Sequence, residues 1–277
     1  MAHIRIISPS GAIDTSYIEG AQRRLLSWGH SVSIAPHATG KWGRFAARDD
    51  ERLSDLVAAL VAPEVDFILC ARGGYGLQRI VARIDAALPE DYDYEHMPTI
   101  IGFSDITVLH AWVQSHGGRS LHAPMCKHLA TLDESTRSMR MMRDALDRKP
   151  LHYDFSFSSP VIGGNLSVLY GLQATPYGLT PGYKVSGCKV SGSTLLIEDI
   201  GERHYHIERM LLGLKMSGVF DHLGGLIIGQ FTDCPDDPGM GETVQETILR
   251  VVGERDYPIL TDAPFGHVDN NLPIWLG

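Results

Sequence analysis

Short apolar runs alternate with amphipathic stretches along this chain, and this alternation narrows the possible folds more than any other property of the sequence. The chain opens with an apolar run at residues 3–8, an amphipathic stretch at 17–28 and a second apolar run at 31–35. The same order continues with a helix at 49–61, a strand at 66–71, a helix at 77–84 and a strand at 99–103. Apolar strands separated by helices predict a parallel sheet that is covered on both faces and binds ligands at the carboxyl ends of its strands.

The pattern breaks over residues 147–160, where polar and turn-forming residues replace the apolar runs. We therefore predict a first domain at residues 1–148, a linker at 149–160 and a smaller second domain at 161–277. The second domain is predicted to hold strands at 161–165, 193–199, 225–231 and 258–261, and helices at 166–173, 206–216 and 243–252. A length of 277 residues agrees with two domains of medium size. The predicted fold class is α/β.

Charge and cysteine content narrow the class of ligand. The chain has 33 acidic and 24 basic residues and a net charge of -9, whereas nucleic-acid binding normally requires a basic surface. We therefore expect a small or peptide-like substrate and no nucleic acid. No apolar run is long enough to cross a membrane, and the N-terminus lacks a signal-peptide pattern. Cys70, Cys126, Cys188 and Cys234 occur singly, which predicts reduced thiols in the cytoplasm rather than a zinc or redox site.

A single hydroxyl group stands at the end of the fourth predicted strand. Ser104 follows the apolar run at 99–103 and precedes a predicted helix. A sharp turn between a buried strand and a helix exposes a serine oxygen, and the helix N-terminus stabilises negative charge that develops beside it. The position therefore suits a nucleophile. The alternative is that Ser104 or Asp105 caps the helix, as serine and aspartate commonly do.

A glycine-rich loop, Ala-Arg-Gly-Gly-Tyr-Gly at residues 71–76, follows the third predicted strand. Its spacing does not match the G-x-G-x-x-G fingerprint of dinucleotide-binding folds, so the support for nucleotide binding is weak. The glycines allow the backbone to approach a ligand closely with free N–H groups, which suits an oxyanion hole or a carboxylate cradle. The alternative is a tight turn between strand and helix.

Two further candidates lie in the predicted second domain. Glu198 ends a predicted strand, where a carboxylate can either orient a histidine or cap a helix. His267 lies in a turn-rich segment after the last predicted strand, where a histidine can act as a base or serve a structural role. His204 and His206 form a His-x-His pair. No third ligand occurs at a spacing typical of metal sites, so we predict no metal site.

Six short motifs occur in order along nearly the whole chain. They are Ser-Pro-Ser-Gly at 8–11, the glycine-rich loop at 71–76, Gly-Phe-Ser-Asp-Ile-Thr at 102–107, Gly-Gly-Asn-Leu at 163–166, Leu-Ile-Glu-Asp-Ile-Gly-Glu at 196–202 and Phe-Gly-His-Val at 265–268. Together they resemble the LD-carboxypeptidase family of serine peptidases, which includes murein tetrapeptide carboxypeptidases and microcin C immunity peptidases. Each motif is weak alone, whereas the ordered set is specific.

The resemblance implies a Rossmann-like N-terminal domain, a smaller C-terminal α/β domain and an active site in the cleft between them. It implies a catalytic triad in which Ser104 is the nucleophile, His267 the general base and later the general acid, and Glu198 the residue that orients the histidine. It also implies that the backbone N–H groups of Gly74 and Asp105 bind the oxyanion. Such chemistry needs no metal, and we expect no cofactor. Family members suggest a homodimer.

Recognition of a free substrate carboxylate is assigned to Arg72, with a salt bridge to a nearby aspartate as the alternative. Asn165 is the second candidate for contact with the substrate. The sequence departs from the family pattern at His122, where a Gly-Pro-Met segment is common, and at Trp275, where a small residue or proline is commoner. Family members usually continue through another strand, so the resemblance implies a trimmed or naturally short form.

The leading predicted function is a cytoplasmic LD-carboxypeptidase that removes the terminal D-alanine of murein tetrapeptides during cell-wall recycling. A second is an immunity-type peptidase that cleaves the amide of a peptide–nucleotide or aminoacyl–nucleotide antibiotic. A third is a non-catalytic module that binds a nucleotide or another ligand. A conventional α/β-hydrolase is disfavoured, because Ser104 lacks the second glycine of G-x-S-x-G. With His267 as the base, activity is expected to fall on the acid side as the imidazole is protonated.

Overall fold

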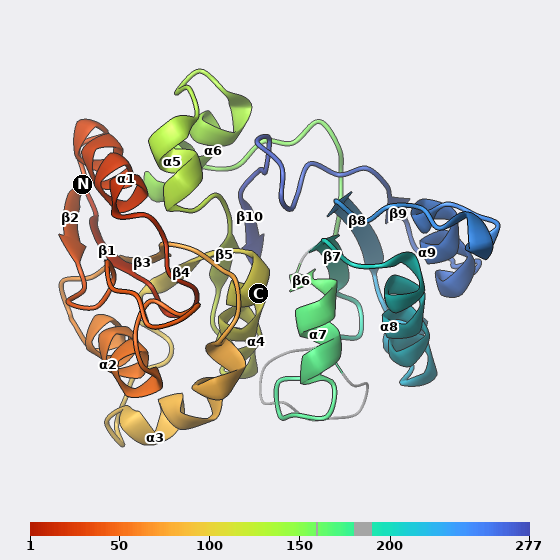
Figure 1. Ribbon diagram of the computed structural model, residues 1–277, viewed down its shortest axis with the longest axis horizontal. Helices are drawn as coiled ribbons and strands as arrows, with labels where there is room; N and C mark the ends of the chain where they lie inside the picture. The colour runs from red at the N-terminus through yellow and green to blue at the C-terminus, as the bar shows by residue number, and fades with distance from the viewer. Residues whose placement is uncertain (159, 180–189) are drawn as a thin grey trace.

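The structure is a computed structural model, which describes residues 1–158, 160–179 and 190–277. Two sheets organise the described chain, one in each half of the molecule (Figure 1). The first sheet has six strands in the order β10-β5-β4-β3-β1-β2, and the second has four in the order β6-β7-β8-β9. The predicted α/β class, with a parallel-sheet N-terminal domain and a second α/β domain, is confirmed.

The first sheet is parallel over most of its width. Its strands are β1 (His3–Ile7), β2 (Ser31–Ile34), β3 (Phe67–Cys70), β4 (Thr99–Gly102), β5 (Ser120–His122) and β10 (Ile274–Leu276). The pairings of β1 with β2 and β3, of β3 with β4, and of β4 with β5 are all parallel. Every residue of β3 is buried, as expected for a central strand of a sheet covered on both faces.

Helices cover both faces of this sheet. They are α1 (Thr15–Ser27), α2 (Asp49–Leu60), α3 (Ile84–Ala87), α4 (Thr107–Ser115), α5 (Cys126–Thr131) and α6 (Arg137–Leu146). Figure 1 shows α1, α5 and α6 on one side of the sheet and α2, α3 and α4 on the other. In α1 the Asp14 side chain caps the amide of Ser16 at 2.9 Å, and Ile18, Ala21 and Leu25 form the buried face.

The predicted helix at 77–84 is wrong in type. The chain forms two 3-10 turns, Leu77–Arg79 and Val81–Arg83, before the short helix α3. Leu77 and Ile80 are both fully buried, and their spacing of three residues matches the three-residue turn of a 3-10 helix. The amide of Leu77 donates to the Asp105 carboxylate at 3.1 Å, so a tertiary contact satisfies the first donor of this segment.

The second sheet is parallel throughout its described pairings. Its strands are β6 (Val161–Asn165), β7 (Thr194–Ile200), β8 (Gly225–Thr232) and β9 (Ile259–Leu260), and its helices are α7 (Leu166–Leu172), α8 (His204–Met216) and α9 (Val244–Val252). Successive side chains of a strand point to opposite faces. Leu195 and Ile197 therefore join the apolar core that includes α8 and α9, whereas Leu196 joins a separate cluster with Phe265.

The last strand returns to the first sheet. β10 pairs antiparallel with β5, with Trp275 opposite Leu121, and Figure 1 shows it beside β5 in the N-terminal half. The sequence predicted neither strand and assigned residues 161–277 as a whole to the second domain. Each of these strands has three residues, which is too short for a periodic apolar pattern. The amide of Asn165 also donates to Thr107 Oγ1 across the two halves at 2.9 Å.

The described cysteines are free, as the sequence predicted. Cys70, Cys126 and Cys234 are free thiols, and burial raises the pKa of Cys70 and of Cys126. Cys188 lies outside the described residues. Within the described ranges, no helix combines the length and the apolar character needed to cross a bilayer.

Candidate active site

Ser104 lies at a sharp turn between β4 and α4. Phe103 is extended, with φ -154°, whereas Ser104 has φ 65°, a left-handed conformation that costs free energy for a residue with a side chain. The helix α4 begins only at Thr107, and its N-terminal residue Ile106 makes no side-chain cap. We call residues 102–106 the serine turn. Ser104 is therefore held in a strained turn and does not cap the helix.

The glycine-rich loop packs directly on this turn. A Cβ atom added to Gly73 would lie 2.8 Å from the Ser104 Cβ and 2.9 Å from its Oγ, closer than real side chains approach. The loop is fixed in turn by the amide of Gly11, which donates to the carbonyl of Gly73 at 3.0 Å. Any side chain at position 73 would have to displace the hydroxyl, so a glycine is required there.

Asp105 links the serine turn to the glycine-rich loop through its side chain. The carboxylate is buried and accepts hydrogen bonds from Ser10 Oγ at 2.5 Å and from the amide of Leu77 at 3.1 Å. Burial raises the pKa of Asp105, although these two hydrogen bonds oppose the shift. The family resemblance implied a role for the backbone amide of Asp105, whereas the hydrogen bond between its side chain and Ser10 was not predicted.

The two predicted oxyanion donors belong to the glycine-rich loop and to the serine turn. Gly74 has φ 110° and lines the same pocket as Ser104, and Asp105 follows Ser104 in the chain. Outside the regular helices and strands, no hydrogen bond of the described residues is donated by the amide of Gly74 or Asp105. Both N–H groups are therefore available to an incoming oxygen atom.

Glu198 and His267 are in direct contact. His267 Nδ1 lies 2.9 Å from Glu198 Oε2, and the Glu198 side chain is completely buried. Because side chains alternate along β7, Glu198 shares the face of Leu196 and points toward the segment that carries His267. The register of β7 against β8 shifts between Ile197 and Asp199, an irregularity that re-aims side chains at this point. The contact fixes the orientation of the imidazole.

The neighbouring acid, Asp199, points the other way. Its carboxylate accepts from Asn165 Nδ2 at 2.9 Å and from the amide of Ser167 at 2.8 Å. Burial raises the pKa of Asp199 to about 6, and the nearby Glu198 contributes in the same direction. Of the two adjacent acids, only Glu198 contacts the histidine.

The loop that carries His267 is held by contacts on several sides. Gly266 has φ 123°, and a Cβ added there would lie 3.0 Å from Glu198 Oε2. The amide of Gly266 donates to Asn271 Oδ1 at 3.0 Å, and Thr232 Oγ1 donates to the carbonyl of His267 at 3.2 Å. The Phe103 ring packs edge-on against the His267 ring at 4.8 Å. Asn271 is a structural residue of the site that sequence analysis did not single out.

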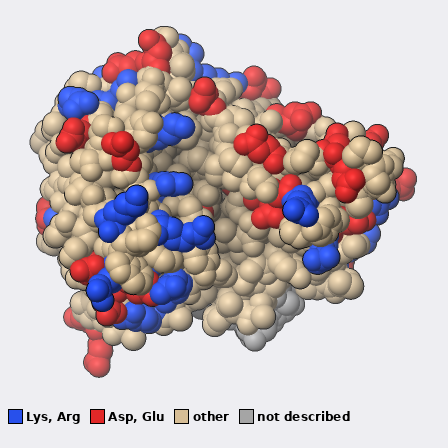
Figure 2. Space-filling view, in the orientation of Figure 1, with Lys and Arg blue, Asp and Glu red and all other residues tan. Residues whose placement is uncertain are grey.

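Ser104 and His267 line one pocket between the two halves of the molecule. Its volume is about 580 Å³, and its lining also includes Arg72, Gly74 and Lys127. Figure 2 shows the surface hollowed between the two halves. Among the described residues, no hydrogen bond joins Ser104 Oγ to the His267 ring. Such contacts are often long in unliganded enzymes and tighten when substrate binds.

The two predicted substrate contacts differ in position. Arg72 is exposed, lines the pocket and donates from Nη1 to the carbonyl of Ala12 at 2.7 Å; within the described chain it pairs with no aspartate. Asn165 is buried, caps α7 by accepting from the amide of Val168, and bonds Asp199. It does not line the pocket of Ser104, but it lies opposite Glu198 in the pairing of β6 with β7.

The His-x-His pair has separate structural partners. His204 is buried between Thr247 Oγ1 at 2.6 Å and the amide of Asp237 at 3.2 Å. His206 contacts Glu202 at 3.3 Å. Across the residues that the structure describes, no group of three or more His, Cys, Asp or Glu side chains is arranged to hold a metal ion.

Behind the serine turn lie two buried histidines, His110 and His122, of which only His122 was singled out from the sequence, as a departure from the family pattern. The His122 ring packs 5.7 Å from Phe103 and 6.4 Å from Phe265, and burial lowers its pKa to about 3. His110 contacts Ser120 Oγ and the carbonyl of Gly102, and burial lowers its pKa to about 4. Both rings are therefore neutral at neutral pH. His122 serves as a packing group, whereas His110 also links Ser120 to the carbonyl of Gly102.

Comparison with known proteins gives an independent line of evidence. The model of the LD-carboxypeptidase N-terminal domain matches residues 4–123, and that of the LD-carboxypeptidase C-terminal domain matches residues 158–277. The murein tetrapeptide carboxypeptidase of Pseudomonas aeruginosa is 29% identical to this chain over an alignment of 293 residues, gaps included. The alignment covers 97% of this chain and 89% of that protein.

Solved structures agree with this assignment. The muramoyltetrapeptide carboxypeptidase from Oxalobacter formigenes has a TM-score of 0.80 and 26% identity, over 100% of this chain and 93% of that chain. The microcin C7 self-immunity protein MccF has a TM-score of 0.82 at 18% identity, over 100% of this chain and 91% of that chain, which is evidence for the fold alone. The two family models together span most of the sequence. The chain therefore belongs to the LD-carboxypeptidase family and is a carboxypeptidase.

Proposed function

We propose that this carboxypeptidase hydrolyses an L-D peptide bond and releases the C-terminal D-amino acid of a murein tetrapeptide, with Ser104, His267 and Glu198 as its catalytic triad. The observation that carries the proposal is the 2.9 Å contact between Glu198 and His267 at a pocket that also contains the strained Ser104. The murein specificity rests on the relatives named above, which are carboxypeptidases of murein peptides by name.

In the acylation step, Ser104 Oγ attacks the carbonyl carbon of the scissile bond and its proton passes to His267 Nε2. The carbonyl oxygen becomes an oxyanion, which accepts hydrogen bonds from the amides of Gly74 and Asp105. Collapse of this intermediate breaks the C–N bond. The leaving amine of the D-amino acid takes the proton from His267, and an ester to Ser104 remains.

In the deacylation step, water attacks the ester carbonyl and gives a proton to His267. The C–O bond to Ser104 breaks, His267 returns the proton to Ser104 Oγ, and the shortened peptide leaves with a new carboxylate. Glu198 accepts the hydrogen bond from Nδ1 and stabilises the imidazolium in both steps. Arg72, exposed at the pocket with one of its N–H groups on Ala12, is proposed to bind the terminal carboxylate of the substrate.

The test is hydrolysis of a murein tetrapeptide by the purified protein, with release of D-alanine as the readout. The wild-type protein is expected to release D-alanine, and the Ser104→Ala variant is expected to bind the peptide without cleaving it. An aminoacyl sulfamoyl adenylate assayed in parallel distinguishes an immunity-type peptidase. Equal binding by both proteins with no cleavage of either compound would instead indicate a non-catalytic binding module.

The proposal includes a cytoplasmic homodimer. The free thiols of Cys70, Cys126 and Cys234 support a reducing compartment, and the dimer is carried over from the family resemblance. Light scattering of the purified chain tests the dimer. One chain has a mass of 30.4 kDa, and the expected result is twice that mass.

A further inference from the structure

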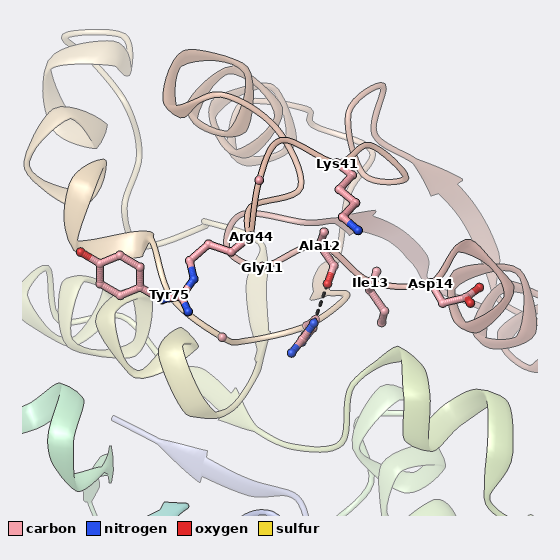
Figure 3. Close-up of a pocket in the computed structure, with 10 residues that line it drawn as sticks. Gly11, Ala12, Ile13, Asp14, Lys41, Arg44 and Tyr75 are labelled. Atoms are coloured by element: carbon pink, nitrogen blue, oxygen red, sulfur yellow. Dashed lines mark hydrogen bonds between the residues drawn. The ribbon is translucent and has the colours of Figure 1, made fainter. Parts of the chain in front are cut away.

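A second pocket adjoins the one that contains Ser104. Its volume is about 690 Å³, and it is lined by Gly11, Ala12, Ile13, Asp14, Lys41, Gly43, Arg44, Arg72, Gly74 and Tyr75 (Figure 3). Ile13, Asp14, Arg72 and Gly74 line both pockets. A molecule bound at Ser104 can therefore extend past the glycine-rich loop into this second space.

Three cations of the second pocket have no acidic partner. Lys41, Arg44 and Arg72 form no ion pair within the described part of the chain, whereas Arg79 and Arg83 of the same domain bind Asp49 and Asp50 at 2.8 and 2.6 Å. Acidic residues outnumber basic ones, 33 to 24, so carboxylates for pairing are not scarce. Figure 2 shows Lys and Arg side chains gathered on the N-terminal half beside the hollow. This concentration of unpaired positive charge favours an anionic ligand.

The backbone that carries these cations is well fixed. The amide of Ala12 donates to the carbonyl of Arg44 at 3.0 Å, and the amide and carbonyl of Trp42 bond those of Phe45 at 2.8 and 3.0 Å. The Arg44 guanidinium lies 5.9 Å from the centre of the Tyr75 ring, which restricts its orientation. The pocket is therefore largely formed before a ligand enters.

Asp14 is the one acidic side chain among the residues that line this pocket. Its carboxylate accepts from the amide of Ser16 at 2.9 Å and so caps α1. In Figure 3, Asp14 lies at the opposite end of the pocket from Arg44 and Tyr75. The charge of Asp14 is directed to the N-terminus of α1. The end of the pocket that holds Arg44 and Tyr75 therefore keeps its positive charge.

We propose that this pocket is a subsite for an anionic group, a carboxylate or a phosphate, which the substrate carries in addition to the group bound beside Ser104. The inference rests on the proposed function, because it makes the second pocket an extension of the same catalytic site. Guanidinium groups bind planar or tetrahedral oxyanions through paired N–H donors, and a lysine adds a mobile charge. The exposed face of Tyr75 can pack against the apolar part next to the anion.

Steady-state kinetics with two matched tetrapeptides tests the subsite. The peptides differ in one internal carboxylate, which is free in the first and a carboxamide in the second. The wild-type protein is expected to prefer the free acid by about tenfold or more in kcat/KM, mainly through KM. The Lys41→Ala/Arg44→Ala variant is expected to lose this preference and to cleave the carboxamide at the wild-type rate.

The Arg48→Ala variant is the matched control. Arg48 lies close to Arg44 in sequence, and its guanidinium packs 5.8 Å from the centre of the Trp42 ring, but it does not line the pocket. The Arg48→Ala substitution removes one positive charge from the same region, and this variant is expected to keep the preference for the free-acid peptide. Loss of preference in both variants would overturn the subsite in favour of a general charge effect, and thermal unfolding confirms that each variant is folded.

Inorganic phosphate distinguishes the two sources of the anion. If phosphate inhibits the wild-type protein competitively but not the double variant, and the two peptides are cleaved alike, the subsite takes a phosphate group. If the peptides differ and phosphate does not inhibit, it takes a carboxylate. A double variant that behaves as wild type in both assays would overturn the proposal.

Calorimetry separates failure of this inference from failure of the proposed function. If the wild-type protein cleaves neither peptide, the proposed function is wrong. The subsite is then tested by binding to the Ser104→Ala protein, where the double substitution is expected to weaken binding of the free-acid peptide by about tenfold and not that of the carboxamide. Equal affinity before and after the double substitution would overturn the subsite.

Discussion

The serine turn and the Glu198–His267 pair meet at the same pocket by different routes. In the serine turn, strain at Ser104 and the close approach of Gly73 place the hydroxyl, and the residues responsible lie within or packed against one strand–helix connection. The pair joins residues 69 positions apart, through a partly buried side-chain hydrogen bond. One half of the proposed machinery is thus built by the backbone and the other by side-chain packing. Substitutions should therefore affect the two halves differently.

The largest expected effect separates the chemical role of Ser104 from its strain. Ser104→Gly should lower hydrolysis of the tetrapeptide by on the order of 10⁴-fold or more, because the nucleophile is lost. The same substitution should raise the free energy of unfolding by about 1 kcal/mol, because glycine adopts φ 65° without steric cost.

Ser104→Ala is the matched control, since it removes the hydroxyl and keeps the strain. It should be as inactive as the glycine variant and no more stable than wild type. Hydrolysis assays and urea unfolding measure the two effects. A glycine variant with residual activity close to wild type would remove Ser104 from the mechanism.

The second prediction addresses the pair. Glu198→Gln should lower kcat by about 10³-fold, because a neutral amide neither selects the tautomer of His267 nor stabilises its protonated form. Asp199→Asn is the control, because Asp199 lies next in the chain but bonds Asn165 and Ser167. It should lower stability and change kcat by less than about tenfold. Equal losses of kcat in the two variants would show that Glu198 has no special role.

The third prediction tests backbone control of the serine turn. Gly73→Ala should lower kcat by about 10²-fold, because the new methyl group would overlap the Ser104 Cβ and Oγ and shift the nucleophile. Gly171→Ala is the control, since its nearest neighbour is the flexible end of Gln78 at 3.0 Å. A Gly73→Ala variant with wild-type kcat would mean that the loop does not position Ser104.

The smallest effect concerns the packing behind the turn. The His122 imidazole stays neutral in the folded protein to about pH 3, whereas in the unfolded chain it takes up a proton below its usual pKa of 6.5. The unfolded state then binds more protons, so stability falls as the pH is lowered from about 6.5 toward 3. His122→Leu should reduce the slope of unfolding free energy against pH in this window by about 1.4 kcal/mol per pH unit.

Urea unfolding at pH 6, 5 and 4 measures this slope. His152→Gln removes an exposed histidine and should leave the slope as in wild type. An unchanged slope in the His122→Leu variant would mean that the imidazole is charged in the folded protein at these pH values.

Local sequence patterns predicted much of the fold because they act over short distances. The strands β1, β3 and β4 were predicted from their apolar runs, and the helix α1 from the spacing of Ile18, Ala21 and Leu25. The predicted turn at Ser104 is confirmed by its positive φ. These features depend on a few adjacent residues, and each leaves a periodic or steric signature in the sequence.

Other features of the site could not be predicted from local patterns. The burial of His122, the role of Asn271 in holding the His267 loop and the capping role of Asn165 depend on which segments pack together. The close contact between the glycine-rich loop and Ser104 could not be predicted either, because it brings together residues about 30 positions apart. A side chain with several possible partners acquires its role only when the packing selects one of them.

The sequence by itself determined the α/β class, the family and the identity of the candidate nucleophile, since repeating apolar runs and short motifs are written in consecutive residues. The family motifs also indicated Glu198 as the partner of His267. The tertiary structure alone decided that Asp199 bonds Asn165 and Ser167, that β10 returns to the first sheet and that unpaired cations gather beside the pocket. These outcomes depend on the alternation of β7 and on contacts between distant segments. Such contacts form only when the whole core is packed, so no short stretch of sequence encodes them.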